Sequence, residues 1–353
     1  MNEVINKINS SKKILVVSHV RPDGDNIGSL SGFTAALALR GLNVTAANCD
    51  PVPHNFSFLP GSSNIIPLAQ VKQKYDLLIV LDSSTVDRVG VSDLSLYSDF
   101  IINIDHHISN ENYGNINLVF PEYSSTSQIV YEIIKTAKYK INSDIATCLY
   151  TGLMTDTVGF QTTSTNHDVF KMAAFLVKNG AKPNNICREI WQNKSLSNIT
   201  ILGKALSTLN FCNNGLICWN KIDQKMLREC KAQPSDVGGI INQMLSIKGV
   251  ETAILFYEES ADSVTIDLRS KSSFDVSKIA THFGGGGHLR ASGATIKGAL
   301  KNVITEVINY AMEELKNNFL NDKNMKGKKD FDTACCGKQK SERSRKIRES
   351  VGI

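Results

Sequence analysis

Short runs of consecutive apolar residues restrict this chain to a small set of folds. They lie within residues 14–17, 76–82 and 101–105, and a stretch with helical spacing, residues 26–40, follows the first of them. A strand without polar alternation has to be covered on both of its faces, which is typical of parallel sheets. The sequence therefore predicts an α/β fold in which helices cover both faces of a parallel sheet.

The pattern changes twice further along the chain. Residues 124–210 are mainly helical in pattern, with one clear helix over 143–157. Beyond residue 211, strand-like runs (216–219, 252–257 and 263–268) accompany helical ones (236–246 and 276–283). We predict a first domain over 1–185, a helical linker over 186–211, a smaller α+β domain over 212–320 and a basic, disordered tail over 321–353.

The formal net charge of +5 is confined to this tail, because residues 321–353 contain ten Lys or Arg and five Asp or Glu. The rest of the chain is formally neutral, which does not favour binding of a long nucleic-acid duplex. No run of about 18 apolar residues occurs, and the N-terminus lacks the apolar segment of a secretory signal. The eight cysteines lack metal-finger spacing. We expect no membrane association, and buried thiols rather than disulfides in a reducing cytoplasm.

Acidic and histidine residues gather where the predicted strands end. The first run is followed by His19, Asp23 and Asp25, the second ends at Asp82, and the third ends at Asp105, His106 and His107. Ligands of parallel sheets bind at the carboxyl ends of the strands, so these side chains are expected to meet there. Asp156 lies at the end of the helix predicted over 143–157.

Each of these positions also has a simpler explanation when taken alone. Asp23 is suited to cap the following helix, Asp82 to cap the turn after its strand, and Asp156 to lie at a helix end on the surface. Four such coincidences together favour one shared site. Mixed carboxylate and imidazole ligands favour Mn²⁺ or Mg²⁺ over a thiolate zinc site.

The ordered set of motifs, with Asp105-His106-His107 at its centre, resembles the DHH phosphoesterase superfamily, and most of all its nanoRNase/pAp-phosphatase (oligoribonuclease) group. Residues 267–270 and 284–293 resemble the DHH-associated C-terminal domain. The resemblance implies two divalent cations, Mn²⁺ before Mg²⁺. One would be held by His19, Asp23 and Asp82, and the other by Asp25, Asp82, His106 and Asp156. It gives catalytic roles to Asp82, as the shared ligand, and to His107, which either orients the scissile phosphate or protonates the leaving oxygen.

Four consecutive glycines in the second domain suggest where substrate is bound. Glycine lets backbone N–H groups approach an anion closely, and an adjacent Arg offers a planar, bidentate fork for phosphate. The predicted substrate-binding residues are Arg269, Ser270, Gly285, Gly286, Gly287 and His288. The alternative is a flexible hairpin turn beside a solvated strand.

These features predict an enzyme that hydrolyses short oligoribonucleotides to mononucleotides, with pAp as a second substrate. Three related enzymatic activities are the alternatives: a RecJ-like single-strand DNA exonuclease, a family II pyrophosphatase, and a phosphodiesterase of cyclic or linear dinucleotides. The pyrophosphatase lacks the glycine segment. A nucleotide-binding protein that only retains the fold is the non-enzymatic alternative, although no predicted metal ligand is missing here. We expect short RNA or nucleotide as the ligand and a homodimer as the assembly.

Overall fold

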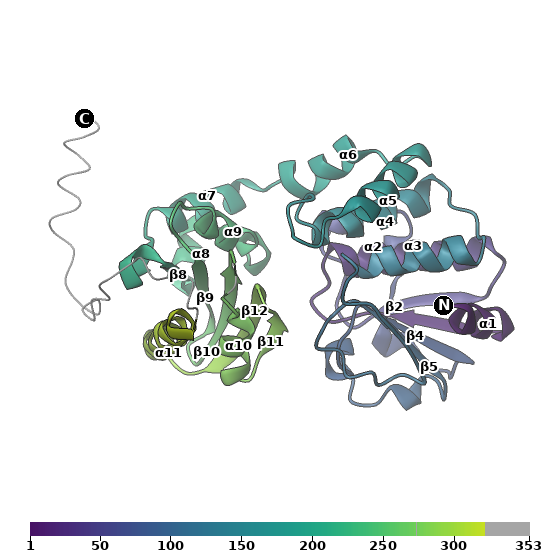
Figure 1. The fold of residues 1–353 in the computed structure, drawn as a ribbon, viewed down its shortest axis with the longest axis horizontal. Coiled ribbons are helices and arrows are strands. Elements are labelled where there is room, and N and C mark those ends of the chain that lie inside the picture. Colours follow the sequence, from purple (N-terminus) through teal and green to yellow (C-terminus); the bar gives the residue numbers. More distant parts are fainter. Residues whose placement is uncertain (273, 322–353) are drawn as a thin grey trace. The chain divides into compact units, whose positions relative to one another are not determined.

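The structure is a computed structural model that describes residues 1–272 and 274–321 (Figure 1). The chain divides into two compact units, the first over Met1–Asn193 and the second from Lys194 onward. The division falls within the segment 186–211 that the sequence assigns to a linker. The predicted tail lies outside the described residues, apart from residue 321, which ends the last helix.

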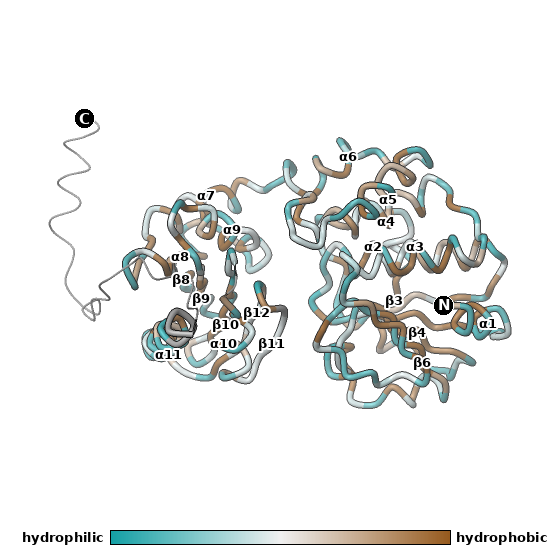
Figure 2. Tube along the Cα trace, viewed as in Figure 1, coloured by the Kyte–Doolittle hydropathy of each residue, from teal (hydrophilic) through white to brown (hydrophobic). Residues whose placement is uncertain are grey.

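A six-stranded parallel sheet forms the centre of the first unit, which confirms the predicted α/β class. Its strand order is β3-β2-β1-β4-β5-β6. The strands are β1 (Ile14–Val17), β2 (Val44–Asn48), β3 (Ile66–Pro67), β4 (Leu77–Leu81), β5 (Ile101–Asp105) and β6 (Ile116–Val119). Three of them, β1, β4 and β5, match the predicted apolar runs, and Figure 2 shows the tube at β4 in the colour of hydrophobic residues. The less apolar β2, β3 and β6 were not predicted.

The two faces of this sheet are covered by different kinds of helix. One face packs its apolar side chains, among them Val16 and Ile79, against α-helices. Of these helices, α2 (Gly24–Leu39) and α3 (Thr126–Thr136) contact the sheet directly. Behind them, α4 (Ser143–Asp156) packs on both, α5 (His167–Lys178) packs on α3 and α4, and α1 (Asn2–Ser10) adds Val4 and Ile8 to the same core. The other face carries Val17 and Val80 and is covered by short 3-10 helices: η3 (Leu68–Gln70), η4 (Asp87–Val89) and η5 (Leu94–Leu96).

The order in which successive strands are added to the sheet reverses between β1 and β4. From β1 the chain passes through α2 to β2 and β3 on one side, and then returns to place β4 on the other side of β1. In open α/β sheets, such a switch in strand order leaves a crevice at the carboxyl ends of the two strands. The residues that follow β1 and β4 therefore face the place where a ligand site is expected.

The second unit is an α+β structure around a second six-stranded sheet, in the order β11-β12-β10-β9-β8-β7. Only the β8–β9 pairing is parallel. The strands are β7 (Asn210–Cys212), β8 (Ile217–Ile222), β9 (Thr252–Ser260), β10 (Ser263–Ser270), β11 (Gly286–His288) and β12 (Ala291–Lys297). The helices are α7 (Leu196–Leu206), α8 (Gln224–Cys230), α9 (Ile240–Leu245), α10 (Val276–His282) and α11 (Leu300–Asn321). Through Ile201 and Ala205, α7 joins the core of this unit, whereas α6 (Pro183–Cys187) packs into the first.

The cysteines of the described residues are all free thiols, as predicted. Burial was expected for them, and four are buried and Cys187 is partly buried, but the prediction is wrong for Cys49, which is exposed just after β2. Cys49 lies one residue past the buried end of β2, and its Sγ lies 3.8 Å from the carbonyl oxygen of Gly90. No helix within the described ranges is both long and apolar enough to cross a membrane.

Candidate metal centre

The acidic and histidine residues predicted from the sequence come together at the carboxyl end of the first sheet. Ligand atoms within 4.8 Å of one another form three overlapping groups: His19, Asp23 and Asp82; Asp25, His106 and Asp156; and Asp82, His106 and His107. The first group is the ligand set implied for one cation. The second group contains three of the four ligands implied for the other cation. The fourth ligand, Asp82, lies beside His106 of this group.

His19 follows β1 and is almost fully buried. Its Nδ1 lies 2.7 Å from the carbonyl oxygen of Val20 and, as a donor there, leaves Nε2 as the atom that meets the acidic groups. Nε2 lies 3.3 Å from Oδ2 of Asp82 and 4.0 Å from Oδ1 of Asp23. A backbone carbonyl that fixes the tautomer in this way is a common support for a metal-binding imidazole.

Asp23 fulfils the helix-capping role and joins the acidic cluster as well. Its Oδ1 accepts hydrogen bonds from the backbone N–H groups of Asp25 and Asn26, and so caps the first turn of α2. The same oxygen is the one nearest to His19. The two explanations considered for this residue are therefore compatible.

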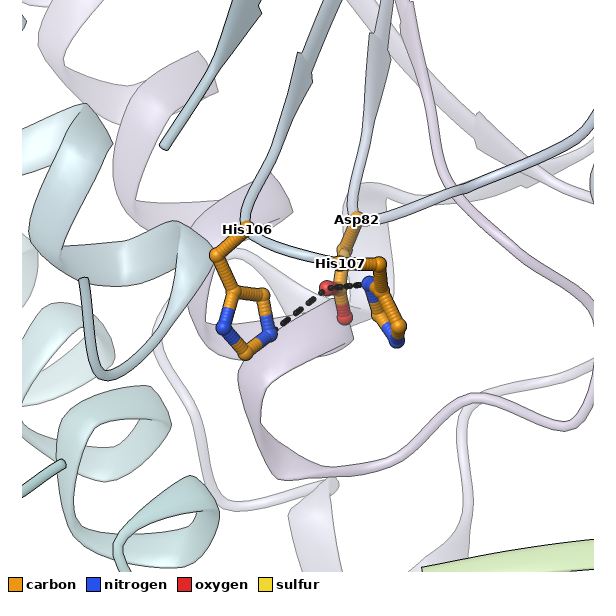
Figure 3. Close-up of side chains that lie close together, drawn as sticks. All are labelled: Asp82, His106 and His107. Carbon is orange, nitrogen blue, oxygen red and sulfur yellow. Dashed lines mark ion pairs between the residues drawn. The ribbon is translucent and has the colours of Figure 1, made fainter. Parts of the chain in front are cut away.

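Asp82 lies at the centre of the cluster. It follows β4 with a φ of 56°, a left-handed conformation that Asp tolerates better than most residues do, and it is 2% exposed. Figure 3 shows His106 and His107 flanking one of its carboxylate oxygens, Oδ1, each through a ring nitrogen 3.6 Å away. Because His19 approaches the other oxygen, both oxygens of Asp82 face imidazoles, an arrangement that suits a ligand shared by two cations.

The two histidines that follow β5 are held differently. Oδ1 of Asp105 accepts hydrogen bonds from the backbone N–H groups of both histidines, and lies 2.7 Å from Nδ1 of His107. Its Oδ2 accepts from the side-chain amide of Asn110. Asp105 is fully buried and serves to orient the histidines, in keeping with its omission from the predicted ligands. His106 instead directs Nε2 toward Asp156, with 3.3 Å between Nε2 and Oδ2.

The pKa values of the acidic side chains are shifted because these groups are buried close to one another. Burial and the charge of Asp82 raise the pKa of Asp25 to about 7. Burial and the charges of Asp25 and Asp82 also raise the pKa of Asp156 well above its usual range. Burial acts to raise the pKa of Asp82 as well, but the hydrogen bond and charge of His19 outweigh it and lower that pKa. Buried carboxylates that resist ionisation side by side are stabilised by a bound cation, so this donor set fits divalent metal ions.

Two residues that contact the acidic cluster were not predicted from the sequence: Thr126 and Ser127 at the start of α3. Their backbone N–H groups donate to the two carboxylate oxygens of Asp25, at 2.7 and 3.0 Å, and the Thr126 hydroxyl donates to Asp82. The only sequence signal was the run Ser124–Ser127, which is typical of a helix N-cap. Contacts across about a hundred residues leave no local pattern.

The predicted substrate-binding residues lie in the second unit, where the structure changes two of the assignments. Ser270 is buried and its hydroxyl donates to the carbonyl of Phe274, so it supports a loop and is not available to a substrate. The backbone N–H of Gly285 donates to the Ala280 carbonyl and caps α10, so this N–H is not part of an open anion nest. Gly284, at φ 76°, begins that cap.

The remaining residues of the glycine run form the edge strand β11. Ala291 on β12 pairs with His288 on β11 and also with Arg269 on β10. His288 and Arg269 therefore lie in one cross-strand row. Gly287 occupies the preceding position with a φ of 138°. The Arg269 guanidinium is held by Oδ1 of Asp267, 2.6 Å from Nη1.

Two family models match the chain, one within each of its two units. Residues 13–153 match the family model described as "DHH family, N-terminal domain", and residues 223–317 match the "DHHA1 domain". The first match spans every predicted metal ligand except Asp156, which lies three residues beyond its end. The second spans Arg269 and the glycine run.

Curated relatives match over most of the chain. A "bifunctional oligoribonuclease and PAP phosphatase NrnA" from Thermus thermophilus is 31% identical over 304 residues, which cover 86% of this chain and 90% of that protein. A protein of the same name from Bacillus subtilis is 26% identical and covers 83% and 92%, respectively.

Solved structures show the same architecture. An exopolyphosphatase-related protein from Bacteroides fragilis superposes with a TM-score of 0.84 at 29% identity, covering 90% of this chain and 97% of that one. RecJ from Thermus thermophilus in complex with Mn²⁺ has a TM-score of 0.53 at 13% identity, covers 88% of this chain and 54% of that one, and so shares the fold alone. With both domain matches, a relative above 30% identity and the clustered acidic and histidine residues, this chain belongs to the DHH family and is a phosphoesterase.

Proposed function

We propose that the protein is a Mn²⁺-dependent phosphodiesterase that releases mononucleotides from very short RNA, with pAp as a second substrate. The observation that carries this proposal is the position of Asp82, which lies between the two groups of ligand atoms with one carboxylate oxygen facing each. The names of the curated relatives support the substrate class.

In this proposal His19, Asp23 and Asp82 hold one cation, while Asp25, Asp82, His106 and Asp156 hold the other. Two bound cations supply positive charge that stabilises the attacking and the leaving oxygen of an in-line displacement at phosphorus. The mixed carboxylate and imidazole donors favour Mn²⁺, with Mg²⁺ as the second choice, and the fold neighbour RecJ was solved with Mn²⁺.

His107 is assigned to the phosphate and not to a cation. Because Asp105 engages its Nδ1, the opposite ring nitrogen, Nε2, is the atom that we assign to the substrate. There it either orients the scissile phosphate or protonates the leaving oxygen.

The second unit is proposed to bind the substrate away from the scissile bond. Asp267 holds one nitrogen of Arg269 in place, and the remaining N–H groups of a guanidinium suit a phosphate. His288 lies in the same cross-strand row, and Gly286 and Gly287 of the edge strand bring backbone close to that row. We retain these four residues and leave out Ser270 and Gly285. We further propose a homodimer, and a cytoplasmic location consistent with the free thiols.

The test is a substrate panel on the full chain with Mn²⁺: di- to pentaribonucleotides, single-stranded DNA, pAp and a cyclic dinucleotide. We expect mononucleotide release to be fastest from the shortest RNA and to be abolished in Asp82→Ala. Full activity of that variant, or a preference for long single-stranded DNA or cyclic dinucleotide, would contradict the proposal.

The role of the second unit is tested by Arg269→Ala with Arg228→Ala as its control, since Arg228 is an exposed arginine of the same unit on α8. We expect Arg269→Ala to raise KM for dinucleotide and to leave Mn²⁺ binding unchanged. An unchanged KM would remove Arg269 from the proposed site.

A further inference from the structure

The first turn of α3 contacts two of the proposed metal ligands at once. Ser125 caps this helix through the N–H of Gln128. The N–H groups of Thr126 and Ser127 are thereby directed to Oδ2 and Oδ1 of Asp25, at 2.7 and 3.0 Å. An ionised carboxylate is stabilised at the N-terminus of a helix, where N–H groups lack partners within the helix.

Thr126 makes a further contact through its side chain. Its hydroxyl donates to Oδ1 of Asp82 at 3.0 Å, and both residues are almost completely shielded from solvent. A single residue thus contacts the carboxylate that comes from α2 and the carboxylate that follows β4. These two carboxylates belong to different ligand groups.

From these contacts we propose that Thr126 is a positioning residue that fixes the orientation of the Asp82 carboxylate for two divalent cations. The inference rests on the proposed function, because it assumes that Asp82 is a shared ligand. The last torsion of an Asp side chain is soft, so the carboxylate plane can rotate unless a donor holds one oxygen. With the hydroxyl on Oδ1, the carboxylate stays turned so that Oδ2 faces His19 and Oδ1 faces His106.

A purely structural role predicts a different outcome from a positioning role. If Thr126 only filled space in the first turn of α3, Val would replace it with a change in stability alone, since Val has the same shape without the hydroxyl. If the hydroxyl positions Asp82, Val weakens metal binding and Ser restores it. Loss of such a supporting contact typically costs about 10–100-fold in metal affinity or activity.

The experiment measures Mn²⁺ binding to the metal-stripped full chain by isothermal titration calorimetry, and the free ion by electron paramagnetic resonance. We compare wild type, Thr126→Val and Thr126→Ser. The matched control is Thr151→Val, because Thr151 is also fully buried but its hydroxyl donates to the carbonyl of Thr147 within α4. We expect about 10–100-fold weaker Mn²⁺ binding for Thr126→Val, and near wild-type binding for Thr126→Ser and Thr151→Val.

Wild-type affinity in Thr126→Val would overturn the inference, and so would equal losses in Thr126→Val and Thr126→Ser. If the Val variant lacks the circular dichroism spectrum of the folded protein, Thr126→Ala replaces it, since Ala also lacks the hydroxyl and needs no additional room. Wild-type protein that binds Mn²⁺ but cleaves nothing in the substrate panel would overturn the proposed function and leave this inference standing. Wild-type protein that binds no Mn²⁺ would overturn both.

Discussion

The packing of α2 against α4 sets the distance between two proposed ligands, and Gly28 lies where the backbones of these two helices approach each other closely. Asp25 lies three residues before Gly28 on α2, and Asp156 lies four residues after Gly152 on α4. A Cβ at Gly28 would lie 2.6 Å from the carbonyl oxygen of Cys148 and 2.9 Å from the backbone nitrogen of Gly152. Both are backbone atoms, so the side chain cannot rotate away and the two helices have to separate.

The size of the effect follows from these distances. Ordinary van der Waals contact begins near 3.4 Å, so Gly28→Ala requires a separation of roughly 0.8 Å. Overpacking a well-filled core costs about 1–3 kcal/mol, while replacing Gly by Ala within a helix contributes about 0.5–1 kcal/mol in the opposite direction. We expect a net loss of about 1–2 kcal/mol, which lowers the Tm of a unit of this size by about 2–8 °C.

The assay is thermal unfolding of the metal-free protein by calorimetry, followed by Mn²⁺ titration. Gly203→Ala is the matched control, because Gly203 also lies inside a helix, α7, but its added Cβ would meet nothing within 4 Å. We expect Gly203→Ala to keep or slightly raise the Tm and to bind Mn²⁺ normally. A Gly28→Ala protein as stable as the control, with wild-type Mn²⁺ affinity, would show that the contact between α2 and α4 at Gly28 does not set the positions of the two ligands.

Three further predictions concern protons, a thiol and the orientation of His107. Because the pKa of Asp25 is raised to about 7 in the folded protein, against about 3.9 when unfolded, the metal-free protein loses stability from this group as pH rises from about 4 to 7. Mn²⁺ binding near pH 6 should release protons, seen by calorimetry in buffers of different ionisation enthalpy, and absence of release would contradict that assignment. Iodoacetamide should label the exposed Cys49 in the folded protein and Cys148 only after unfolding, because Cys148 is buried and burial raises its pKa. Peptide mass spectrometry distinguishes the two thiols, and equal labelling rates would contradict the burial of Cys148. Asp105→Asn should lower kcat about 10-fold or more, since it removes the negative charge beside Nδ1 of His107. Mn²⁺ affinity should change little, because Asn keeps an oxygen that accepts from the backbone N–H groups of both histidines, and steady-state kinetics with unchanged kcat would exclude that role.

Features with a local signal could be predicted from the amino-acid sequence alone. The apolar runs at Ile14–Val17, Leu77–Leu81 and Ile101–Asp105 specify buried parallel strands, since only a sheet covered on both faces accepts them. Once those strands are parallel, their carboxyl ends lie at one edge, and this places His19, Asp82 and His106 together without any knowledge of the tertiary contacts. The clustered ligand atoms follow that expectation.

The pairing of individual polar atoms could not be predicted from the sequence. The contacts of Thr126 with Asp25 and Asp82 join residues 101 and 44 positions apart, respectively, and a pairing over such distances has no periodicity that a single sequence can reveal. The same holds for Ser270, whose hydroxyl was expected to meet a substrate but is used by the Phe274 carbonyl. Apolar periodicity reports which side of an element is buried, whereas the partner of a buried polar atom depends on how separate elements pack, because that atom bonds to whichever group the fold brings within reach.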